Sequence, residues 1–256
     1  MIDALKSSLP ADLAGKILRV SNRRRKKLSA GVRRFVDKAY YRALFGLKIP
    51  HLPALTRKLA ALERPQGRGD APVAQEIWES QYRDGHWAFL QDIEQMTRYS
   101  VIAGYIQALT PKGCLLDVGC GEGVLLDRLG SNNYSKFVGI DFAQAAIERA
   151  ARKHHPRSVF VQGDAQFYVP NEIFDATIFN EVLYYFPDPL ALADRYRAWL
   201  RPGGIFITSL YADSDRARAI GRLLKKTYRS IDEVEIASHG KSWLVNVFAP
   251  PSAEKN

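Results

Sequence analysis

The stretch Leu115-Leu116-Asp117-Val118-Gly119-Cys120-Gly121-Glu122-Gly123 decides the fold class of this 256-residue chain. Its first half, with Cys114 before it, has the apolar run of a buried strand, and its glycines form a turn that opens a helix. Glycines let the backbone approach a ligand closely, and the free N–H groups of a helix N-terminus can bind it. Val124 stands where the dinucleotide fingerprint G-x-G-x-x-G needs its third glycine. The stretch therefore predicts a ligand-binding loop but disfavours NAD.

Strand and helix patterns alternate after this loop. A helical pattern over 92–109 precedes it, and two final strand-like runs, 234–237 and 243–248, are joined by the turn residues 238–241 and predict a hairpin. Such alternation is typical of an α/β fold. We expect a Rossmann-like, doubly wound, mainly parallel seven-stranded sheet with a C-terminal antiparallel hairpin, preceded by a helical N-terminal arm. The other expected strands are 114–118, 137–140, 159–162, 174–179 and 204–210, and the later helices are 123–129, 144–154, 189–200 and 215–227.

Acidic and polar residues follow the ends of successive predicted strands. Asp141 lies 22 residues after Gly119, where a carboxylate can accept hydrogen bonds from both hydroxyls of a ribose. Asp164 follows the third strand and could accept from an exocyclic amine such as that of adenine. Asn180 and Glu181 follow the fourth strand. Because ligands bind beyond the carboxyl ends of parallel strands, these residues belong to one predicted site.

Together, these segments resemble the motifs of the class I S-adenosylmethionine-dependent methyltransferases. The resemblance extends from about Pro111 to Leu210, with five motifs in the order of that family. It implies S-adenosyl-L-methionine as the cofactor and methyl transfer as the reaction. The segments that carry it are 115–123, 138–142, 162–165, 174–185 and 200–204.

The resemblance also implies roles for individual residues. Gly119 and Gly121 would line the amino-acid part of the cofactor, and Asp141 would hold its ribose. Phe142 would pack on the adenine, while Asp164 would read the adenine edge. The expected cofactor-binding set is Asp117, Gly119, Cys120, Gly121, Asp141, Phe142, Asp164, Ala165 and Asn180.

Asp117 and the cysteines also have simpler interpretations. Asp117 is expected to accept hydrogen bonds from loop N–H groups and so to order the cofactor loop. Cys114 and Cys120 are expected to be small packing residues. Neither their spacing nor that of the five histidines matches a metal site, so no metal is predicted.

Catalysis of methyl transfer consists mainly of alignment, with a proton acceptor where the methyl acceptor needs one. The candidates for that acceptor are Glu181, Tyr185 and His86. The aromatic-rich segment before the first strand resembles the lids of family members that act on sugars or small metabolites, and no large insertion later in the chain could serve instead. Core packing is the alternative interpretation of these aromatic residues. The candidates for substrate contact or lid are Tyr82, Trp87, Tyr99 and Tyr184.

Positive charge is concentrated at the N-terminus. The net charge is +10, but residues 1–73 hold 17 of the 37 Lys and Arg and only 5 of the 27 Asp and Glu, so they carry +12 and the remainder −2. Apolar helical stripes accompany these basic residues, as in helices that bind anionic membrane surfaces. The arm is a solvated extension, a contact for an anionic membrane surface or acidic partner, or a nucleic-acid contact. Nucleic acid is less favoured, because Asn180-Glu181-Val182-Leu183 lacks the Asn-Pro-Pro-aromatic motif of base-amine methyltransferases.

Composition divides the chain into three predicted parts. They are a basic helical arm and linker (1–73), an aromatic-rich helical lead-in or lid (74–110) and an S-adenosylmethionine-binding domain (111–250). The two prolines and two glycines of residues 64–72 indicate the linker. With no long apolar run, no signal-peptide pattern and two cysteines, the chain is predicted to be cytoplasmic, and peripheral to the inner membrane face if the arm binds there.

The predicted function is methyl transfer from S-adenosylmethionine to an oxygen or nitrogen atom of a small metabolite or saccharide. Two alternatives stay open. One is an RNA methyltransferase that uses the basic arm, and the other is a non-catalytic cofactor-fold adaptor module.

Overall fold

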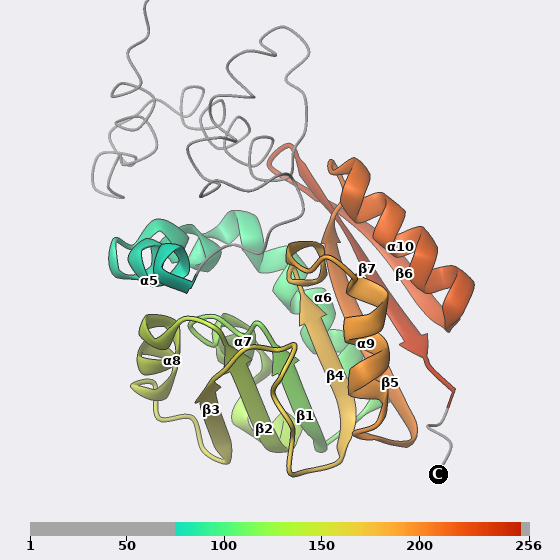
Figure 1. The fold of residues 1–256 in the computed structure, drawn as a ribbon, viewed down its shortest axis with the longest axis horizontal. Helices are drawn as coiled ribbons and strands as arrows, with labels where there is room; N and C mark the ends of the chain where they lie inside the picture. The colour runs from blue at the N-terminus through green and yellow to red at the C-terminus, as the bar shows by residue number, and fades with distance from the viewer. Residues whose placement is uncertain (1–74, 252–256) are drawn as a thin grey trace, which may run out of the picture. The chain divides into compact units, whose positions relative to one another are not determined.

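The computed structural model describes residues 75–251 (Figure 1). The predicted basic arm therefore lies outside the described residues. Residues 75–83 and the chain from residue 87 onward belong to one compact unit, whereas Asp84–His86 are grouped with the N-terminal segment. The elements are α5 (Gln75–Arg83), η2 (His86–Gln91), α6 (Ile93–Leu109), β1 (Gly113–Val118), α7 (Val124–Leu129), η3 (Ser131–Asn133), β2 (Tyr134–Asp141), α8 (Gln144–Ala151), β3 (Ser158–Gln162), β4 (Phe174–Asn180), η4 (Leu183–Tyr185), α9 (Pro189–Arg197), β5 (Leu200–Tyr211), α10 (Asp215–Thr227), β6 (Arg229–Ser238) and β7 (Lys241–Ala249).

The strands form one seven-stranded sheet in the order β3-β2-β1-β4-β5-β7-β6. The first five strands of the chain pair in parallel, and β7 pairs antiparallel with both β5 and β6. His239 and Gly240 form the two-residue hairpin turn, and both have positive φ (51° and 74°), as a turn compatible with the twist of the strands requires. The predicted seven-stranded fold and its final hairpin are confirmed.

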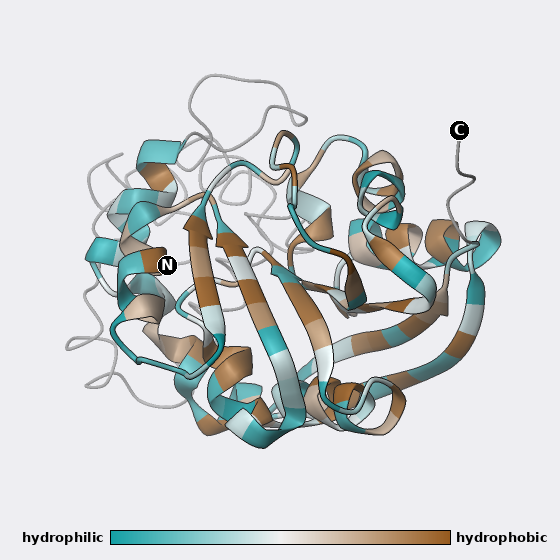
Figure 2. Cartoon of the chain, turned by 90° about the horizontal axis from the view of Figure 1, so that it is seen from below, coloured by the Kyte–Doolittle hydropathy of each residue, from teal (hydrophilic) through white to brown (hydrophobic). Residues whose placement is uncertain are grey.

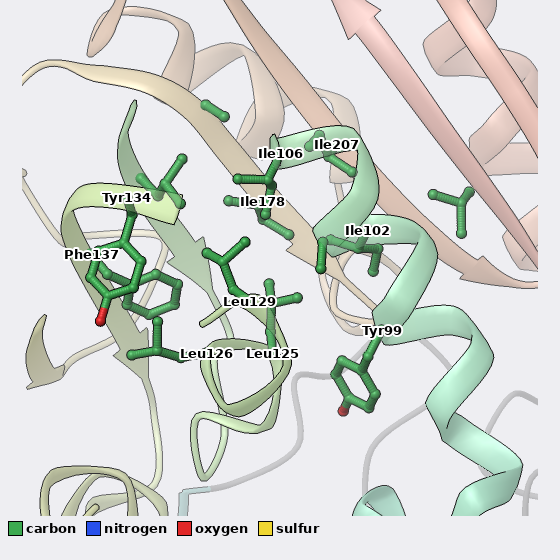
Figure 3. Close-up of a cluster of buried hydrophobic side chains, with 14 of the residues drawn as sticks. Tyr99, Ile102, Ile106, Leu125, Leu126, Leu129, Tyr134, Phe137, Ile178 and Ile207 are labelled. Carbon is green, nitrogen blue, oxygen red and sulfur yellow. The ribbon is translucent and has the colours of Figure 1, made fainter. Parts of the chain in front are cut away.

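Helices cover both faces of the sheet. Helices α6 and α7 pack on one face, where Tyr99, Ile102 and Ile106 meet Leu125 and Ile178 (Figure 3). On the other face, aromatic contacts join β4 and β5 to α9 and to the end of α10. Figure 2 shows the strands as predominantly apolar and the helices as two-sided. Burial on both faces explains why β1 is buried at every position and reads as a continuous apolar run.

Capping side chains fix the start of two helices on the second face. Asp188 accepts from the N–H of Ala191 (2.9 Å) at the start of α9, and Pro189 occupies the first turn, where its missing N–H is not needed. Ser214 accepts from the N–H of Ala217 (3.2 Å) at the start of α10. This helix has the predicted bounds.

The predicted ends of α8 and α9 are wrong. Helix α8 ends at Ala151, because His154 adopts a left-handed conformation (φ 50°) and His155 turns back to Asp127, with 2.8 Å between Nε2 and Oδ1. Leu200 was predicted to end α9, but it pairs with Phe174 and begins β5. Within residues 75–251, no helix is long and apolar enough to cross a lipid bilayer.

Candidate functional site

The glycine loop between β1 and α7 has the backbone conformation that its glycines predict. Gly119, Gly121 and Gly123 all have positive φ (75°, 54° and 71°). A Cβ atom on Gly119 would lie 2.6 Å from Cγ2 of Val182, and one on Gly121 would lie 2.8 Å from the hydroxyl of Tyr82. Side chains at these two positions are therefore excluded both by conformation and by space.

Asp141, at the end of β2, holds this loop. Its Oδ2 accepts from the N–H of Gly121 (2.8 Å), and its Oδ1 accepts from the N–H of Ala143 (2.9 Å). Burial raises the pKa of Asp141 to about 6, although these backbone hydrogen bonds favour the ionised form. Each carboxylate oxygen can accept a further hydrogen bond. The expectation that Asp117 orders the loop is therefore wrong, because the side chain bonded to the loop backbone is that of Asp141.

Asp117 and Arg98 carry opposite charges that the surrounding chain leaves incompletely paired. Each residue is 1% exposed, and neither Oδ1 of Asp117 nor Nε of Arg98 has a hydrogen-bond partner within the described chain. Burial raises the pKa of Asp117 to about 7, the negative charge of Asp141 adds to this rise, and Arg98 opposes it. Arg98 donates to the side-chain amides of Gln95 (3.1 Å) and Asn180, interacts with Tyr99, and is attracted by the charge of Glu181, but its Nε stays without a partner in the described chain. A buried cation and a buried carboxylate with free positions suit a zwitterionic group, such as the amino-acid end of S-adenosylmethionine.

Glu181 follows β4 in a strained, left-handed conformation (φ 60°). Its carboxylate accepts from the hydroxyls of Tyr184 and Ser209, both at 2.8 Å. Burial raises the pKa of Glu181, whereas Arg98 and these hydroxyls oppose the rise. Glu181 and Asn180 thus lie at the same edge of the sheet as the glycine loop. Glu181 stays a candidate for catalysis.

The aromatic candidates divide between the loop and the core. The hydroxyl of Tyr82 lies beside Gly121, and Tyr82 and Trp87 are buried in one cluster with alanines at the start of α8. The Tyr185 ring lies 4.8 Å from that of Tyr184, measured between centroids. Tyr99 belongs to the main core. The lid role of these residues is still a prediction, as is the catalytic role of His86, which lies outside the compact unit of the sheet.

The residues expected at the adenine are arranged along the ends of β2 and β3. The carbonyl of Phe142 accepts from the side-chain amides of Gln75 (3.1 Å) and Gln162 (3.2 Å). Asp164 accepts from the N–H of Gln166 (2.8 Å) through Oδ1. Ala165 is buried, as is Cys120, whose thiol makes only a weak contact with the adjacent carbonyl. Their contacts with a cofactor remain predictions.

Arg98 and Gln95 were missed from the sequence. They lie on the face of α6 that also carries Ile102 and Ile106, and all four residues are buried. Polar side chains on an otherwise apolar helical stripe are the signal that could have indicated them, because buried polar residues need specific partners.

Comparison with known proteins identifies the family. Residues 80–244, more than half of the chain, match the family described as "Methyltransferase domain". The chain therefore belongs to this family, and its domain is of the class I S-adenosylmethionine-dependent methyltransferase type. The predicted class of enzyme and cofactor are confirmed at this level.

Individual relatives are more distant. The chain is 33% identical over 99 residues to trans-aconitate 2-methyltransferase of Rhizobium leguminosarum bv. trifolii. This match covers 37% of each chain. It is 28% identical over 172 residues to 27-O-demethylrifamycin SV methyltransferase of Amycolatopsis mediterranei, covering 59% of this chain and 62% of the other. The matched region thus spans less than two thirds of these curated relatives.

Solved structures support the fold. The N-methyltransferase NodS of Bradyrhizobium japonicum, in complex with S-adenosyl-L-homocysteine, superimposes with a TM-score of 0.60 at 20% identity, over 70% of this chain and 98% of NodS. Magnesium protoporphyrin IX methyltransferase of Synechocystis, with bound S-adenosylmethionine, gives 0.56 at 13% identity, over 68% and 96% of the two chains. At such identities the similarity is one of fold.

Proposed function

We propose that this chain transfers the methyl group of S-adenosylmethionine to an oxygen or nitrogen atom of a small metabolite or saccharide. The observation that carries the proposal is the pair of buried, incompletely satisfied charges, Asp117 and Arg98, beside the glycine loop. Arg98 would bind the carboxylate of the cofactor and Asp117 its ammonium group. Asp141 would accept from the ribose hydroxyls while it keeps its hold on the loop.

When bound, the cofactor supplies an activated methyl group, so the residues of the chain need only align the acceptor, exclude water and receive a proton where one is released. Glu181 and Tyr185 are the proposed acceptor-side residues, because they follow β4 at the same edge of the sheet. The hydroxyls that bind Glu181 hold its carboxylate in one orientation. His86 is the third candidate from the sequence.

The relatives support a small acceptor. Their names state trans-aconitate and 27-O-demethylrifamycin SV as substrates, and a third, from Histophilus somni, is a ubiquinone biosynthesis O-methyltransferase, 31% identical over 136 residues. We extend to this chain only what they share, which is a small organic acceptor. The class of acceptor is tested with S-adenosylmethionine carrying a tritiated methyl group, offered to metabolite fractions, polysaccharide and RNA. Transfer to RNA alone would contradict the proposal.

Cofactor binding is tested with Asp141→Asn in the full chain. We expect the free energy of S-adenosylmethionine binding to become less favourable by about 1–3 kcal/mol, because the amide of Asn carries no charge and has fewer acceptor positions than the carboxylate. Asp175→Asn is the matched control. Asp175 also accepts from a backbone N–H, that of Cys114 in β1 (2.7 Å), but it lies at the start of β4, at the opposite end of the strand from Asn180. Titration calorimetry on both folded variants decides the matter. Equal affinity of Asp141→Asn and wild type would remove Asp141 from the site.

A further inference from the structure

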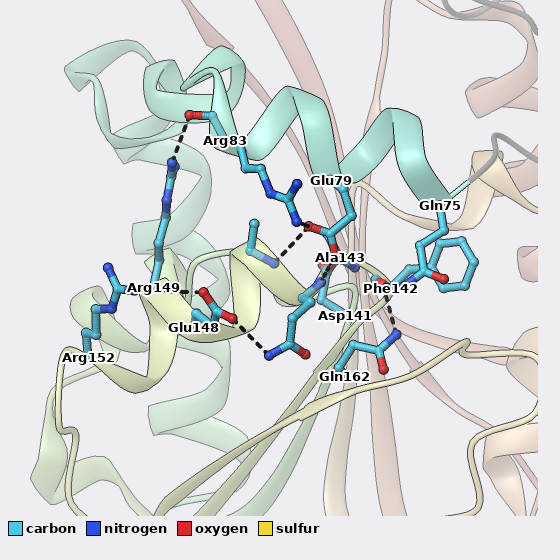
Figure 4. Close-up of polar contacts among 12 residues, drawn as sticks. Gln75, Glu79, Arg83, Asp141, Phe142, Ala143, Glu148, Arg149, Arg152 and Gln162 are labelled. Atoms are coloured by element: carbon cyan, nitrogen blue, oxygen red, sulfur yellow. Dashed lines mark hydrogen bonds and ion pairs between the residues drawn. The ribbon is translucent and has the colours of Figure 1, made fainter.

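The N-terminus of α8 lacks a capping side chain of its own. Its N-cap residue is Ala143, which makes no side-chain hydrogen bond, and alanine is a poor residue at this position. The missing acceptor comes from another helix. The carboxylate of Glu79, on α5, accepts from the N–H groups of Gln144 (2.5 Å) and Ala145 (3.1 Å). Figure 4 shows Glu79 pointing from α5 toward Ala143 at the start of α8.

Further contacts hold α5 on the same connection. Gln75, one turn before Glu79, donates to the carbonyl of Phe142 (3.1 Å), and Tyr82, in the next turn, packs with the alanines that begin α8. Successive turns of α5 thus contact the segment of chain that joins β2 to α8. The side chain of Glu79 is 14% exposed, and Arg83, 3.7 Å away, is largely exposed and adds little to its fixation.

The same connection carries the proposed contacts to the adenosine part of the cofactor. Asp141 and Phe142 lie immediately before Ala143, and Asp141 itself accepts from the N–H of Ala143. A shift of α5 or of the start of α8 would therefore displace the residues proposed to contact the ribose and the adenine. The position of α5 also brings the hydroxyl of Tyr82 close to Gly121 of the glycine loop.

We propose that Glu79 is a positioning residue that fastens α5 over the adenosine end of the cofactor site by capping α8. This inference rests on the proposed function for the identity of the ligand. The negative charge of Glu79 is stabilised by the positive end of the α8 dipole, and the cap joins two elements more than 60 residues apart in the sequence. Release of this contact opens the adenosine end, so Glu79 controls how long the cofactor stays bound.

The test compares Glu79→Ala and Glu79→Gln with the control Glu148→Gln in the full chain. Glu148 lies on α8 itself and is exposed, and its side-chain partners within residues 75–251 are Gln144 and Arg152 of the same segment. Its substitution therefore removes the same charge without touching α5. Cofactor dissociation is followed by stopped-flow fluorescence of the tryptophans, and affinity by calorimetry. Amide hydrogen exchange reports on residues 75–83 and on the N–H groups of 144 and 145.

Glu79→Ala is expected to raise the dissociation rate and the Kd for S-adenosylmethionine at least tenfold and to accelerate exchange across α5. Glu79→Gln should show smaller changes, because its amide oxygen can still accept one N–H, and Glu148→Gln should match the wild type. At saturating cofactor, kcat should be preserved while the KM for cofactor rises, a split that a general loss of folding would not give.

The proposal would be overturned if both Glu79 variants released the cofactor at the wild-type rate. It would also be overturned if Glu148→Gln released the cofactor as fast as Glu79→Ala does. Should Glu79→Ala fail to fold, the comparison rests on Glu79→Gln. If the wild-type chain itself binds no S-adenosylmethionine, the proposed function fails instead. Exchange in the cofactor-free protein then still shows whether Glu79 fastens α5.

Discussion

At the scale of single residues, the site brings together carboxyl groups whose surroundings disfavour their ionised form. Asp117 is buried and Asp141 is half-buried on the adjacent strand, and desolvation raises the pKa of each. The buried guanidinium of Arg98 donates to two neutral amides and also interacts with Tyr99 and Glu181, and its Nε has no partner in the described chain. Functional sites often carry such perturbed groups, because a ligand can supply the missing partner.

Asp117→Asn is expected to have opposite effects on stability and on binding. In the native protein the pKa of Asp117 is about 7, above its ordinary value of 3.8, so the unfolded chain releases this proton first and the free energy of unfolding falls as pH rises from 4 to 7. The variant should lose less stability over this range, and at pH 8 it should be more stable by up to about 4 kcal/mol. Its affinity for S-adenosylmethionine should fall, because the amide no longer attracts an ammonium group.

Urea denaturation at pH 4 and pH 8, with calorimetry of cofactor binding, measures both effects. A stability difference between variant and wild type that is the same at both pH values would show that Asp117 titrates normally. Unchanged affinity would remove Asp117 from the cofactor site.

Gly121→Ala should lose cofactor binding beyond any loss of stability, because a Cβ at this position meets the hydroxyl of Tyr82 and fills the space where backbone and ligand approach. Gly203→Ala is the matched control: Gly203 also has positive φ (81°), but a Cβ there meets nothing within 4 Å. Both variants pay a similar conformational penalty of about 1–2 kcal/mol. Thermal shift by S-adenosylmethionine separates them, and a full shift in Gly121→Ala would place the cofactor elsewhere.

At the scale of elements, helix α5 and the following helix η2 pack against the start of α8, and α5 also lies beside the glycine loop. Tyr82 and Trp87 are buried (5% and 6% exposed), so truncation of either side chain affects the stability of the fold as well as any lid. The hydroxyl of Tyr82, by contrast, lies against Gly121 of the glycine loop. Removal of this one group is therefore the more selective probe.

Tyr82→Phe is expected to lower the free energy of unfolding by less than about 1 kcal/mol and to weaken cofactor binding severalfold. Trp87→Ala should instead lower the free energy of unfolding by about 3–5 kcal/mol, because it leaves a cavity in the aromatic cluster. Denaturation and calorimetry on both variants test the pair. Parallel losses of stability and affinity in Tyr82→Phe would favour a packing role alone.

At the scale of the whole molecule, charge separates the chain into two parts. Residues 1–73 carry +12, and the remainder, which includes the methyltransferase domain, carries −2. The arm therefore stays a predicted contact for an anionic surface, independent of the cofactor site.

The full chain is expected to sediment with anionic liposomes at low salt, whereas a chain that begins at Ala71 should not, while it still binds S-adenosylmethionine. Each Lys or Arg held near an anionic leaflet contributes roughly 1 kcal/mol. Phe35 and Leu44 belong to the apolar helical stripe expected in the arm. Phe35→Ser and Leu44→Ser should weaken liposome binding but leave RNA binding unchanged, because phosphate contacts dominate the latter. If the full-length protein is soluble but does not sediment with anionic liposomes at low salt, the membrane hypothesis is wrong.

The sequence by itself determined the strands, most helices, the hairpin and the family. These features depend on local information: apolar runs buried on both faces, glycines that tolerate positive φ at 119, 121 and 123, and carboxylates placed just after strands. The ends of α8 and α9 were less predictable, because the turn at His154 and the pairing of Leu200 with Phe174 depend on partners remote in sequence.

Only the tertiary structure decided which side chains contact one another around the glycine loop. It assigned the hold on the glycine loop to Asp141 rather than Asp117, brought Arg98 from α6 to Asn180, and placed Glu79 of α5 at the start of α8. Each of these contacts joins residues at least 20 positions apart. Sequence patterns report the periodicity of one element, whereas such contacts depend on how elements pack against one another, and no local pattern records that.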